Sequence, residues 1–214
     1  MSHLVMIGAG GHARVLAEAL KAQRAVLAGF VTKEPEQASG VMAGLPRLGS
    51  DGDLLAGGPQ ATELVNGIGS TGNANLRRAL FERFCCAGFK FARVIHPAAT
   101  IASDVVLGEG AQIMAGAVLQ PGVVIGANAI VNTGTLLDHD VRIGDHTHIA
   151  PGASIAGGVT VGAGVHIGAG ATIIQGLQVG DGALVAAGAA VVRDVGAAAM
   201  VAGVPARPSA ARSR

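Results

Sequence analysis

The second half of the chain repeats with a period of six residues. Seventeen consecutive positions at this spacing carry Ile, Leu or Val, and none is skipped: Ile95, Ile101, Leu107, Ile113, Leu119, Ile125, Val131, Leu137, Ile143, Ile149, Ile155, Val161, Ile167, Ile173, Val179, Val185 and Val191. A period of six fits neither a helix nor a simple alternating strand. It is typical of a parallel β-solenoid, in which each six-residue unit forms a short strand and a corner.

Two further columns accompany this one. A small or β-branched residue stands two places before most of the repeated positions, as in Ala99, Val105, Ala111, Ala117, Val123, Ala129, Thr135, Val141, Thr147, Ala153 and Val159. Gly often follows the repeated residue, as in Gly108, Gly126, Gly144, Gly162, Gly168 and Gly180. We expect the two apolar columns to point inward. We expect Gly, Asn and Asp to supply the unusual backbone angles that corners need.

Composition separates the chain into two parts. All five Phe and all three Lys lie within residues 1–91, and no aromatic residue follows Phe91. We therefore place a small domain at 1–91, the solenoid at 92–196 and a C-terminal extension at 197–214. Half of the residues are hydrophobic, but no uninterrupted apolar run reaches about 18 residues, so we expect no membrane insertion. A net charge of +1 gives no electrostatic reason to expect nucleic acid as a partner.

The N-terminal segment HLVMIGAGGHARVLAEAL indicates a strand at 4–7, a Gly-rich turn and a helix. Val15, Leu16, Ala19 and Leu20 are expected to form the apolar face of that helix. Residues 8–13 match G-x-G-x-x-A, a weak dinucleotide motif. The next strand, expected at 25–31, ends in Thr32 and Lys33, and acidic residues follow only at 34 and 36, which disfavours NAD. The turn either cradles an anionic group such as a diphosphate or is a tight turn without a ligand.

Residues 138–148 gather three His and three Asp in a chain that is only 14% charged. A metal site, an acid–base catalyst and a solvated edge could each explain this cluster. His146 and His148 could chelate together, but zinc takes three or four ligands, so we expect no metal. His146 is expected to be a solvated corner residue.

The two cysteines, Cys85 and Cys86, are adjacent and have no other cysteine to pair with. We expect reduced, partly buried thiols, and a reactive thiol is the alternative. Reduced thiols, together with the lack of a basic leader before the first apolar segment, favour a cytoplasmic protein.

The repeat and the C-terminal VAGVPAR (201–207) resemble the hexapeptide-repeat acyltransferases. With the GAGGHARV turn and the segment GIGSTGNANLRRALFERF (67–84), nearly the whole chain is similar to one subgroup, the bacterial nucleotide-amino-sugar N-acetyltransferases and sialic acid O-acetyltransferases. The resemblance implies a Rossmann-like α/β domain followed by a left-handed parallel β-helix with three repeats, or eighteen residues, per coil. That coil would stack His148 and His166 on one outer face. It also implies a homotrimer with active sites between subunits.

The resemblance also implies residue roles. Residues 132–140 match N-T-x-x-x-x-x-H-[DE], which makes His139 the general base and Asp140, or secondly Asp138, the carboxylate that orients it. Asn132 joins this catalytic group and lines the sugar pocket. Acetyl-CoA would be the co-substrate, held by His148, Ala169 and Ala187. The sugar-nucleotide site would comprise Gly10, Gly11, His12, Ala13, Thr32, Lys33 and Gly69, although acidic residues often stand in this subgroup where this chain has Thr32 and Lys33.

These features together predict an acetyl-CoA-dependent N-acetyltransferase. Its substrate would be a nucleotide-linked amino sugar of bacterial surface glycan biosynthesis. An activated acyl donor needs no metal, and a neutral imidazole can take the proton of an amine near pH 7. The alternatives are an O-acetyltransferase of the sialic or legionaminic acid branch and a non-enzymatic solenoid used for assembly.

Overall fold

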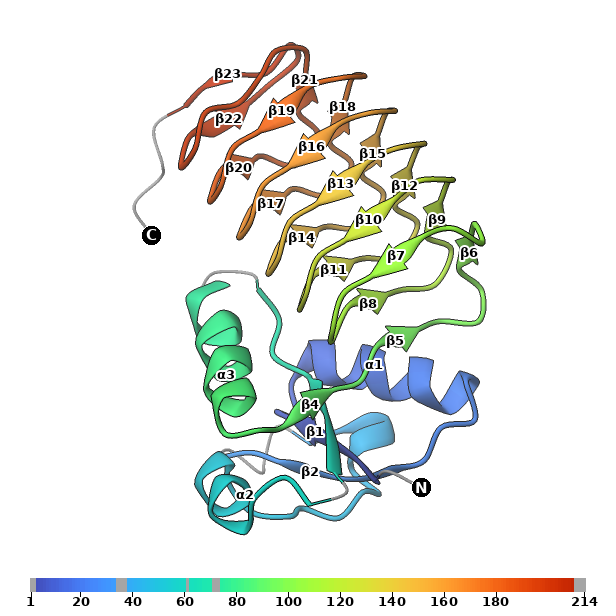
Figure 1. Cartoon of the computed structure of the whole chain (residues 1–214), viewed down its shortest axis with the longest axis vertical. Helices are drawn as coiled ribbons and strands as arrows, with labels where there is room; N and C mark the ends of the chain where they lie inside the picture. The colour runs from blue at the N-terminus through green and yellow to red at the C-terminus, as the bar shows by residue number, and fades with distance from the viewer. Residues whose placement is uncertain (1–2, 34–37, 61, 71–73, 210–214) are drawn as a thin grey trace. The chain divides into compact units, whose positions relative to one another are not determined.

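The computed structural model describes residues 3–33, 38–60, 62–70 and 74–209 (Figure 1). The acidic residues at 34 and 36 lie outside the described residues. The chain divides into two compact units, Met1–Pro97 and Ala98–Arg214. In the described part of the chain, no helix is long and apolar enough to cross a membrane.

The first unit is an α/β domain built on a parallel four-stranded sheet of order β2-β1-β3-β4. The strands are β1 (His3–Ile7), β2 (Leu27–Val31), β3 (Thr62–Asn66) and β4 (Lys90–Phe91). The connections carry α1 (Gly11–Ala22), the short 3-10 helix η2 (Gly40–Met42), α2 (Asp51–Gly57) and α3 (Ala74–Cys86). The predicted strand–turn–helix start and the second strand are confirmed, since β1 and β2 fall within two residues of the expected bounds.

Helix α1 buries a different face from the predicted one. Leu16, Ala19 and Leu20 are buried as expected, but Val15 is 46% exposed. The buried stripe also contains Ala13 and Ala17, and residues 13, 16, 17 and 20 follow the i, i+3, i+4, i+7 spacing of one helical face. Val15 lies one residue outside that stripe, so the prediction that it points inward is wrong.

Four of the Phe residues pack together in this unit. The ring centroids of Phe81 and Phe91 lie 4.5 Å apart. Phe84 meets Phe89 edge to face at 5.2 Å, and all four rings are buried. These contacts fix α3 against the end of the sheet around β4. The clustering of Phe in residues 1–91 thus reflects a core that packs a helix on a sheet.

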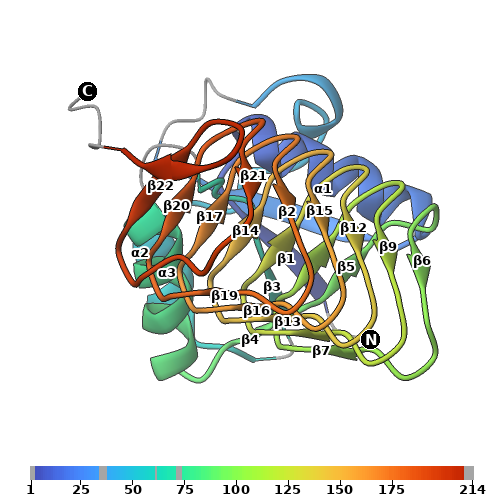
Figure 2. The same cartoon turned by 90° about the horizontal axis from the view of Figure 1, so that it is seen from above.

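The second unit is a parallel β-solenoid whose coils have three short strands. Between residues 100 and 191, strands pair at a spacing of eighteen residues, as Val124 pairs with Arg142 and Arg142 with Thr160. The last parallel pairing, of Leu184 with Met200, spans sixteen. The coil is triangular in section, with one sheet on each face (Figure 2). The predicted fold class, an α/β domain followed by a parallel β-helix, is confirmed.

The three faces are named here by their strands. The β14 face contains β8 (Gln112–Ile113), β11 (Ile130–Val131), β14 (His148–Ile149), β17 (His166–Ile167), β20 (Leu184–Val185) and β22 (Met200–Ala202). The β12 face contains β6 (Thr100–Ile101), β9 (Val118–Leu119), β12 (Leu136–Leu137), β15 (Ser154–Ile155), β18 (Thr172–Ile173) and β21 (Ala190–Val191). The β13 face contains β7 (Val106–Leu107), β10 (Val124–Ile125), β13 (Arg142–Ile143), β16 (Thr160–Val161) and β19 (Gln178–Val179). The same sheet as the β14 face also includes β23 (Arg207–Pro208), which pairs antiparallel with β22, and β5 (Val94–Ile95).

From Ala111 and Ile113 onward both inward columns are buried as predicted, whereas members of the first coil, such as Ile101, Val105 and Leu107, are half-buried. Ile113, Ile149 and Ile167 have no exposed surface. The small column lies beside them and includes Thr147, whose hydroxyl donates to the Gly162 carbonyl at 2.7 Å. That inward hydroxyl therefore satisfies its hydrogen bonding inside the core, where an unpaired polar group would be costly.

The glycines that follow the repeated residue serve close stacking instead of corner angles. Gly144 lacks a positive φ, but a Cβ placed there would lie 2.5 Å from the carbonyl carbon of Gly162 on the next coil. The left-handed backbone falls two residues later, at residues such as Asn128, Asp140 and His146. The expectation that Gly, Asn and Asp supply the corner angles is thus confirmed at this later position, which also carries Gly110, Gly164 and Gly182 with positive φ. It is wrong for the column of glycines that directly follows the repeated residue.

Candidate active site

The first unit contains a pocket of about 670 Å³ at the carboxyl ends of β1, β2 and β3. It is lined by Ile7, Gly8, Ala9, Gly10, Gly11, His12, Val31, Thr32, Lys33, Asp51, Gly67, Ile68, Gly69, Leu76 and Leu80. Ligands of open parallel α/β sheets bind at this end of the strands. Six of the seven residues expected in the sugar-nucleotide site line the pocket. The seventh, Ala13, is fully buried in α1 behind it.

The Gly-rich turn brings the start of α1 to this pocket. Gly8 has φ +88, and Gly10 is the N-cap of α1 with no side-chain cap bond. The N–H groups in the first turn of a helix have no intrahelical acceptors, and the helix dipole favours negative charge there. The turn therefore presents backbone donors to the pocket at residues 11–13, which suits an anionic group.

Arg77 holds the segment at the end of β3 that lines the pocket, and sequence reasoning did not single it out. It is 1% exposed, and its Nη1 donates to the carbonyls of Asn66 at 2.9 Å and Ile68 at 2.7 Å. Burial lowers the pKa of this guanidinium to about 9. Arg77 falls on the same helical stripe as the buried Leu80, Phe81 and Phe84, and a charged residue on an apolar stripe could have indicated it.

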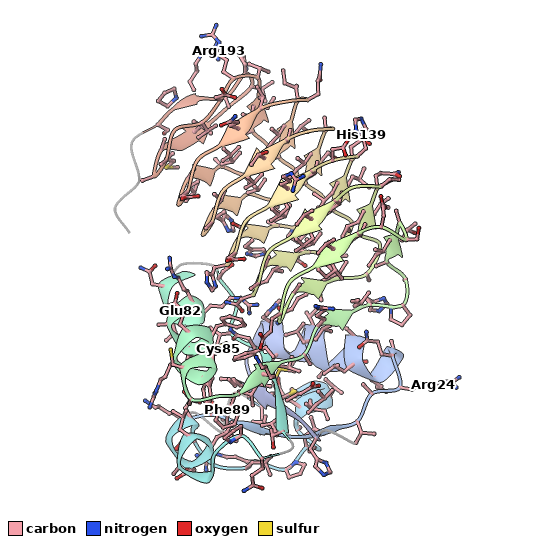
Figure 3. The ribbon with its side chains drawn as sticks, in the orientation of Figure 1. Arg24, Glu82, Cys85, Phe89, His139 and Arg193 are labelled. Carbon is pink, nitrogen blue, oxygen red and sulfur yellow. The ribbon has the colours of Figure 1, made fainter. Side chains whose placement is uncertain are left out.

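On the solenoid, His139 and Asp140 form an exposed pair at the edge between the β12 and β13 faces (Figure 3). The Nδ1 of His139 lies 2.9 Å from the Oδ2 of Asp140. The hydrogen bond with Asp140, and then the negative charge of Asp138, raise the pKa of His139 above its ordinary value. Asp138 also accepts a hydrogen bond from the His139 backbone N–H at 2.8 Å. A neutral His139 with its proton on Nδ1 would direct the lone pair of Nε2 away from Asp140, as a general base requires.

Asn132 contacts His148 instead of His139. Its Nδ2 lies 3.2 Å from the His148 Nε2, and its Oδ1 accepts from the backbone N–H of Thr133 at 2.8 Å. Because the amide oxygen is used by Thr133, the amide nitrogen donates to His148. The Nε2 of His148 is then an acceptor, so the ring is neutral and carries its proton on Nδ1.

The predicted stack of His148 and His166 is confirmed. The two residues pair across β14 and β17, and their ring centroids lie 5.0 Å apart in an edge-to-face arrangement. His148 is only 6% exposed, and burial lowers the pKa of His166. Burial therefore favours the neutral form of His166.

Ala169 and Ala187 lie at the edge between the β14 and β12 faces, one coil apart. The carbonyl of Ala169 accepts from the backbone N–H of Gly188 at 2.8 Å, and both alanines are exposed. Asn132 lies at the same edge, two coils before Ala169. Asn132, His148, Ala169 and Ala187 thus form one group, called the β14-edge group below.

The structure does not bring this group to His139 within one chain. His139 lies where the β12 and β13 faces meet, and in a triangular section that edge is opposite the β14 face (Figure 2). The seven-residue spacing of Asn132 and His139 therefore places them on different edges. A site that uses both clusters has to be completed by a second molecule.

The structure also places His146 and the two cysteines. The Nδ1 of His146 lies 3.0 Å from the Nδ2 of Asn128 one coil earlier, and His146 is half-buried. Cys85 is half-buried and Cys86 is exposed, and neither forms a disulfide. Among the described residues, no three His, Cys, Asp or Glu side chains are grouped to hold a metal ion.

Comparison with known proteins identifies both units. Residues 104–139 and 140–175 match the bacterial transferase hexapeptide (six repeats) model, and residues 3–84 match the PglD N-terminal domain model. No curated protein sequence matches the chain at a significant level. A parallel solenoid that matches the hexapeptide model, joined to an α/β domain that matches the PglD N-terminal model, places the chain among acyltransferases of the hexapeptide class.

Three solved structures cover almost the whole chain. A histidine-to-asparagine variant of perosamine N-acetyltransferase from Caulobacter crescentus, in complex with CoA and GDP-perosamine, is 36% identical over 99% of this chain and 98% of that chain, with a TM-score of 0.89. The acetyltransferase domain of PglB from Neisseria gonorrhoeae, in complex with acetyl coenzyme A, is 36% identical over 97% and 98%, with a TM-score of 0.87. WeeI from Acinetobacter baumannii is 26% identical over 98% and 100%, with a TM-score of 0.79. The chain belongs to the hexapeptide-repeat sugar acetyltransferases.

Proposed function

We propose that the protein transfers the acetyl group of acetyl-CoA to the amino group of a nucleotide-linked amino sugar. The observation that carries this proposal is the pair of His139 and Asp140, an oriented imidazole on an exposed solenoid edge. It is supported by two relatives at 36% identity, one bound to CoA and GDP-perosamine and the other to acetyl coenzyme A. A GDP-linked 4-amino sugar is therefore the first substrate to test, and surface glycan synthesis in the cytoplasm is the proposed setting.

In the proposed reaction, the neutral sugar amine attacks the carbonyl carbon of the thioester directly. A C–N bond forms, the C–S bond breaks and the thiolate of CoA leaves. The Nε2 of His139 takes the proton that the amine nitrogen loses. Asp140 holds the ring by its Nδ1 and stabilises the imidazolium that forms.

The two ligands would occupy different parts of the protein. The diphosphate would lie on the turn at Gly10, Gly11, His12 and Ala13, with Thr32, Lys33 and Gly69 around the rest of the nucleotide. Acetyl-CoA would lie along the β14-edge group, with His148 near the thioester and with Ala169 and Ala187 offering backbone groups. No step of this chemistry is assigned to a metal.

The position of the β14-edge group supports an active site between subunits. His139 and His148 lie on opposite sides of one solenoid, so a single chain cannot place both at one thioester. A homotrimer with cyclic symmetry would present the His139 edge of one subunit to the β14 face of its neighbour at each of three equivalent interfaces.

Replacing His139 tests the proposed base. His139→Ala is expected to lower kcat by about 10²- to 10⁴-fold, the usual contribution of a general base. Gln175→Ala is a matched control, because Gln175 is exposed at the same edge two coils later. Turnover is measured as free thiol released from acetyl-CoA. Near-normal turnover by the His139→Ala variant would contradict the assignment.

The choice of acceptor separates the alternatives. The panel comprises GDP-, UDP- and dTDP-linked 4-amino sugars, a 3-amino sugar nucleotide and free and CMP-linked nonulosonic acids. Thiol release with one amino-sugar nucleotide supports N-acetylation. Release only with a nonulosonic acid would indicate O-acetylation. Silence with every acceptor, together with no CoA binding by calorimetry, would favour a non-enzymatic solenoid.

A further inference from the structure

We propose that Gly157 is a positioning residue whose missing side chain makes the seat for the His139 imidazole. This inference rests on the proposed role of His139 as the base. Gly157 lies one coil after His139 at the same edge. The residues at this register position, coil by coil, are Ser103, Pro121, His139, Gly157, Gln175 and Arg193.

The backbone does not require glycine at this position. Gly157 is not among the residues with positive φ; the left-handed residue of this corner is Gly158, with φ +69. Serine, proline, glutamine and arginine occupy the equivalent place on other coils, so the corner accepts many side chains. All of these residues are exposed, whereas Gly157 is buried.

The ring of His139 is what covers Gly157. A Cβ built on Gly157 would lie 2.5 Å from the His139 Nε2, 2.6 Å from its Cε1 and 3.0 Å from its Cδ2. Contacts this short do not occur for real methyl groups, so either the ring or the backbone has to move. The backbone is held, because the Gly158 N–H donates to the His139 carbonyl at 2.9 Å. The ring is therefore the part that would be displaced.

Displacing the ring would undo its orientation by Asp140. The imidazole is fixed at two points, by the Nδ1 contact with Asp140 and by the surface of Gly157 beneath its Nε2 edge. A methyl group at position 157 occupies the space in which the ring now rests and turns the ring away from Asp140. Gly157 thus acts through His139, and alanine there should impair the base without removing it.

The first test measures the His139 ring directly and does not depend on turnover. In histidine-labelled protein, the His139 resonance is assigned by its loss in His139→Ala, and its pKa is followed by NMR titration. Gly157→Ala is expected to lower this pKa toward the ordinary value, because the hydrogen bond with Asp140 is lost. Gly196→Ala is the control, since Gly196 lacks a positive φ and has open space around its Cβ position.

The second test is a double-mutant cycle in kcat. Gly157→Ala alone is expected to lower kcat by about 10- to 100-fold, as for a misplaced catalytic group. In the His139→Ala background it should cause no further loss. A His139 pKa and kcat both unchanged in a folded Gly157→Ala variant would overturn the proposal, as would an equal loss of kcat in both backgrounds. Retained activity in His139→Ala would instead refute the proposed base. The NMR titration would still show whether Gly157 positions the His139 ring.

Discussion

The side-chain amide of Asn132 donates to the Nε2 of His148 on the following coil, across 3.2 Å. The amide oxygen is engaged by Thr133, so the donor and acceptor roles in this pair are fixed. Asn132 therefore selects the form of His148 that carries its proton on Nδ1. Within one chain, its role is to orient a residue of the β14-edge group.

Asn132→Asp should reverse this selection. A carboxylate accepts hydrogen bonds only, so it favours either a proton on Nε2 or the doubly protonated ring. The nitrogen chemical shifts of His148, read by NMR, should change from the Nδ1–H pattern in the wild type. The KM for acetyl-CoA should rise by about 3- to 30-fold, the worth of one hydrogen bond. A wild-type protein that already carries the proton on Nε2 would contradict the assignment.

The pH dependence of kcat/KM should report the pKa of His139. The base is active when neutral, so activity falls as pH drops through this pKa, which Asp140 and then Asp138 raise above 6.5. Asp140→Asn removes the larger cause and should move the acidic limb to lower pH. Asp138→Asn should move it less, by an amount that shrinks with added salt. Asp181→Asn, at a different edge, is the control, and an unmoved limb in Asp140→Asn would exclude His139 as the titrating base.

Gly11→Ala separates an anion cradle from a tight turn without a ligand. The nearest atom to a Cβ at Gly11 is the Arg14 Nη2 at 3.8 Å, so the fold accepts the methyl group. The free energy of unfolding should change by less than about 1 kcal/mol, because alanine favours helix formation. Affinity for the nucleotide sugar, measured by calorimetry, should fall several-fold because the methyl enters the pocket. Gly52→Ala in α2 is the control, and unchanged affinity in Gly11→Ala would favour the ligand-free turn.

Arg77→Met should destabilise the first unit. Methionine fills the volume but leaves the carbonyls of Asn66 and Ile68 without the donor that now satisfies them. A loss of about 2–4 kcal/mol in the free energy of unfolding is expected, because one buried and one part-buried acceptor lose a charged donor. The neighbouring Arg78→Met is a matched control, because its ion pair with Glu82 is exposed and should contribute less than about 1 kcal/mol. Equal losses in the two variants would mean that Arg77 contributes little.

Mixed oligomers test the proposed site between subunits. His139→Ala and His148→Ala chains, each of low activity, are refolded together in equal amounts. If each site takes one histidine from each of two neighbours, random assembly of trimers should restore about a quarter of wild-type activity. Mixing the two proteins without unfolding is the control. No recovery in refolded mixtures, with trimers confirmed by light scattering, would refute a shared site.

The periodic parts of this fold could be predicted from the sequence, whereas contacts between coils could not. The apolar column from Ile95 to Val191 has no gaps and fits only a repeat of six residues. It therefore predicts both the position of each short strand and the residue of that strand that points inward. The partner of Asn132 depends on which residue of the following coil lies beside it, and the spacing of residues near Asn132 does not show this. Glycine is likewise needed at positions 144 and 157 because of close contacts with residues that lie eighteen positions away in the sequence. Arg77 could have been noticed on its apolar stripe, but its two carbonyl partners lie beyond the helix.

The eighteen-residue coil fixes the distances between equivalent residues along the solenoid. Each coil advances the chain by one strand spacing, about 4.8 Å. Ala169 and Ala187 are one coil apart, so the contact points of a ligand that binds both are separated by one strand spacing. Insertion of one complete coil between residues 149 and 169 would preserve every inward column yet shift Ala169 and Ala187 one step from His148. Such a protein should fold normally and prefer an acyl donor whose arm is longer by that one step.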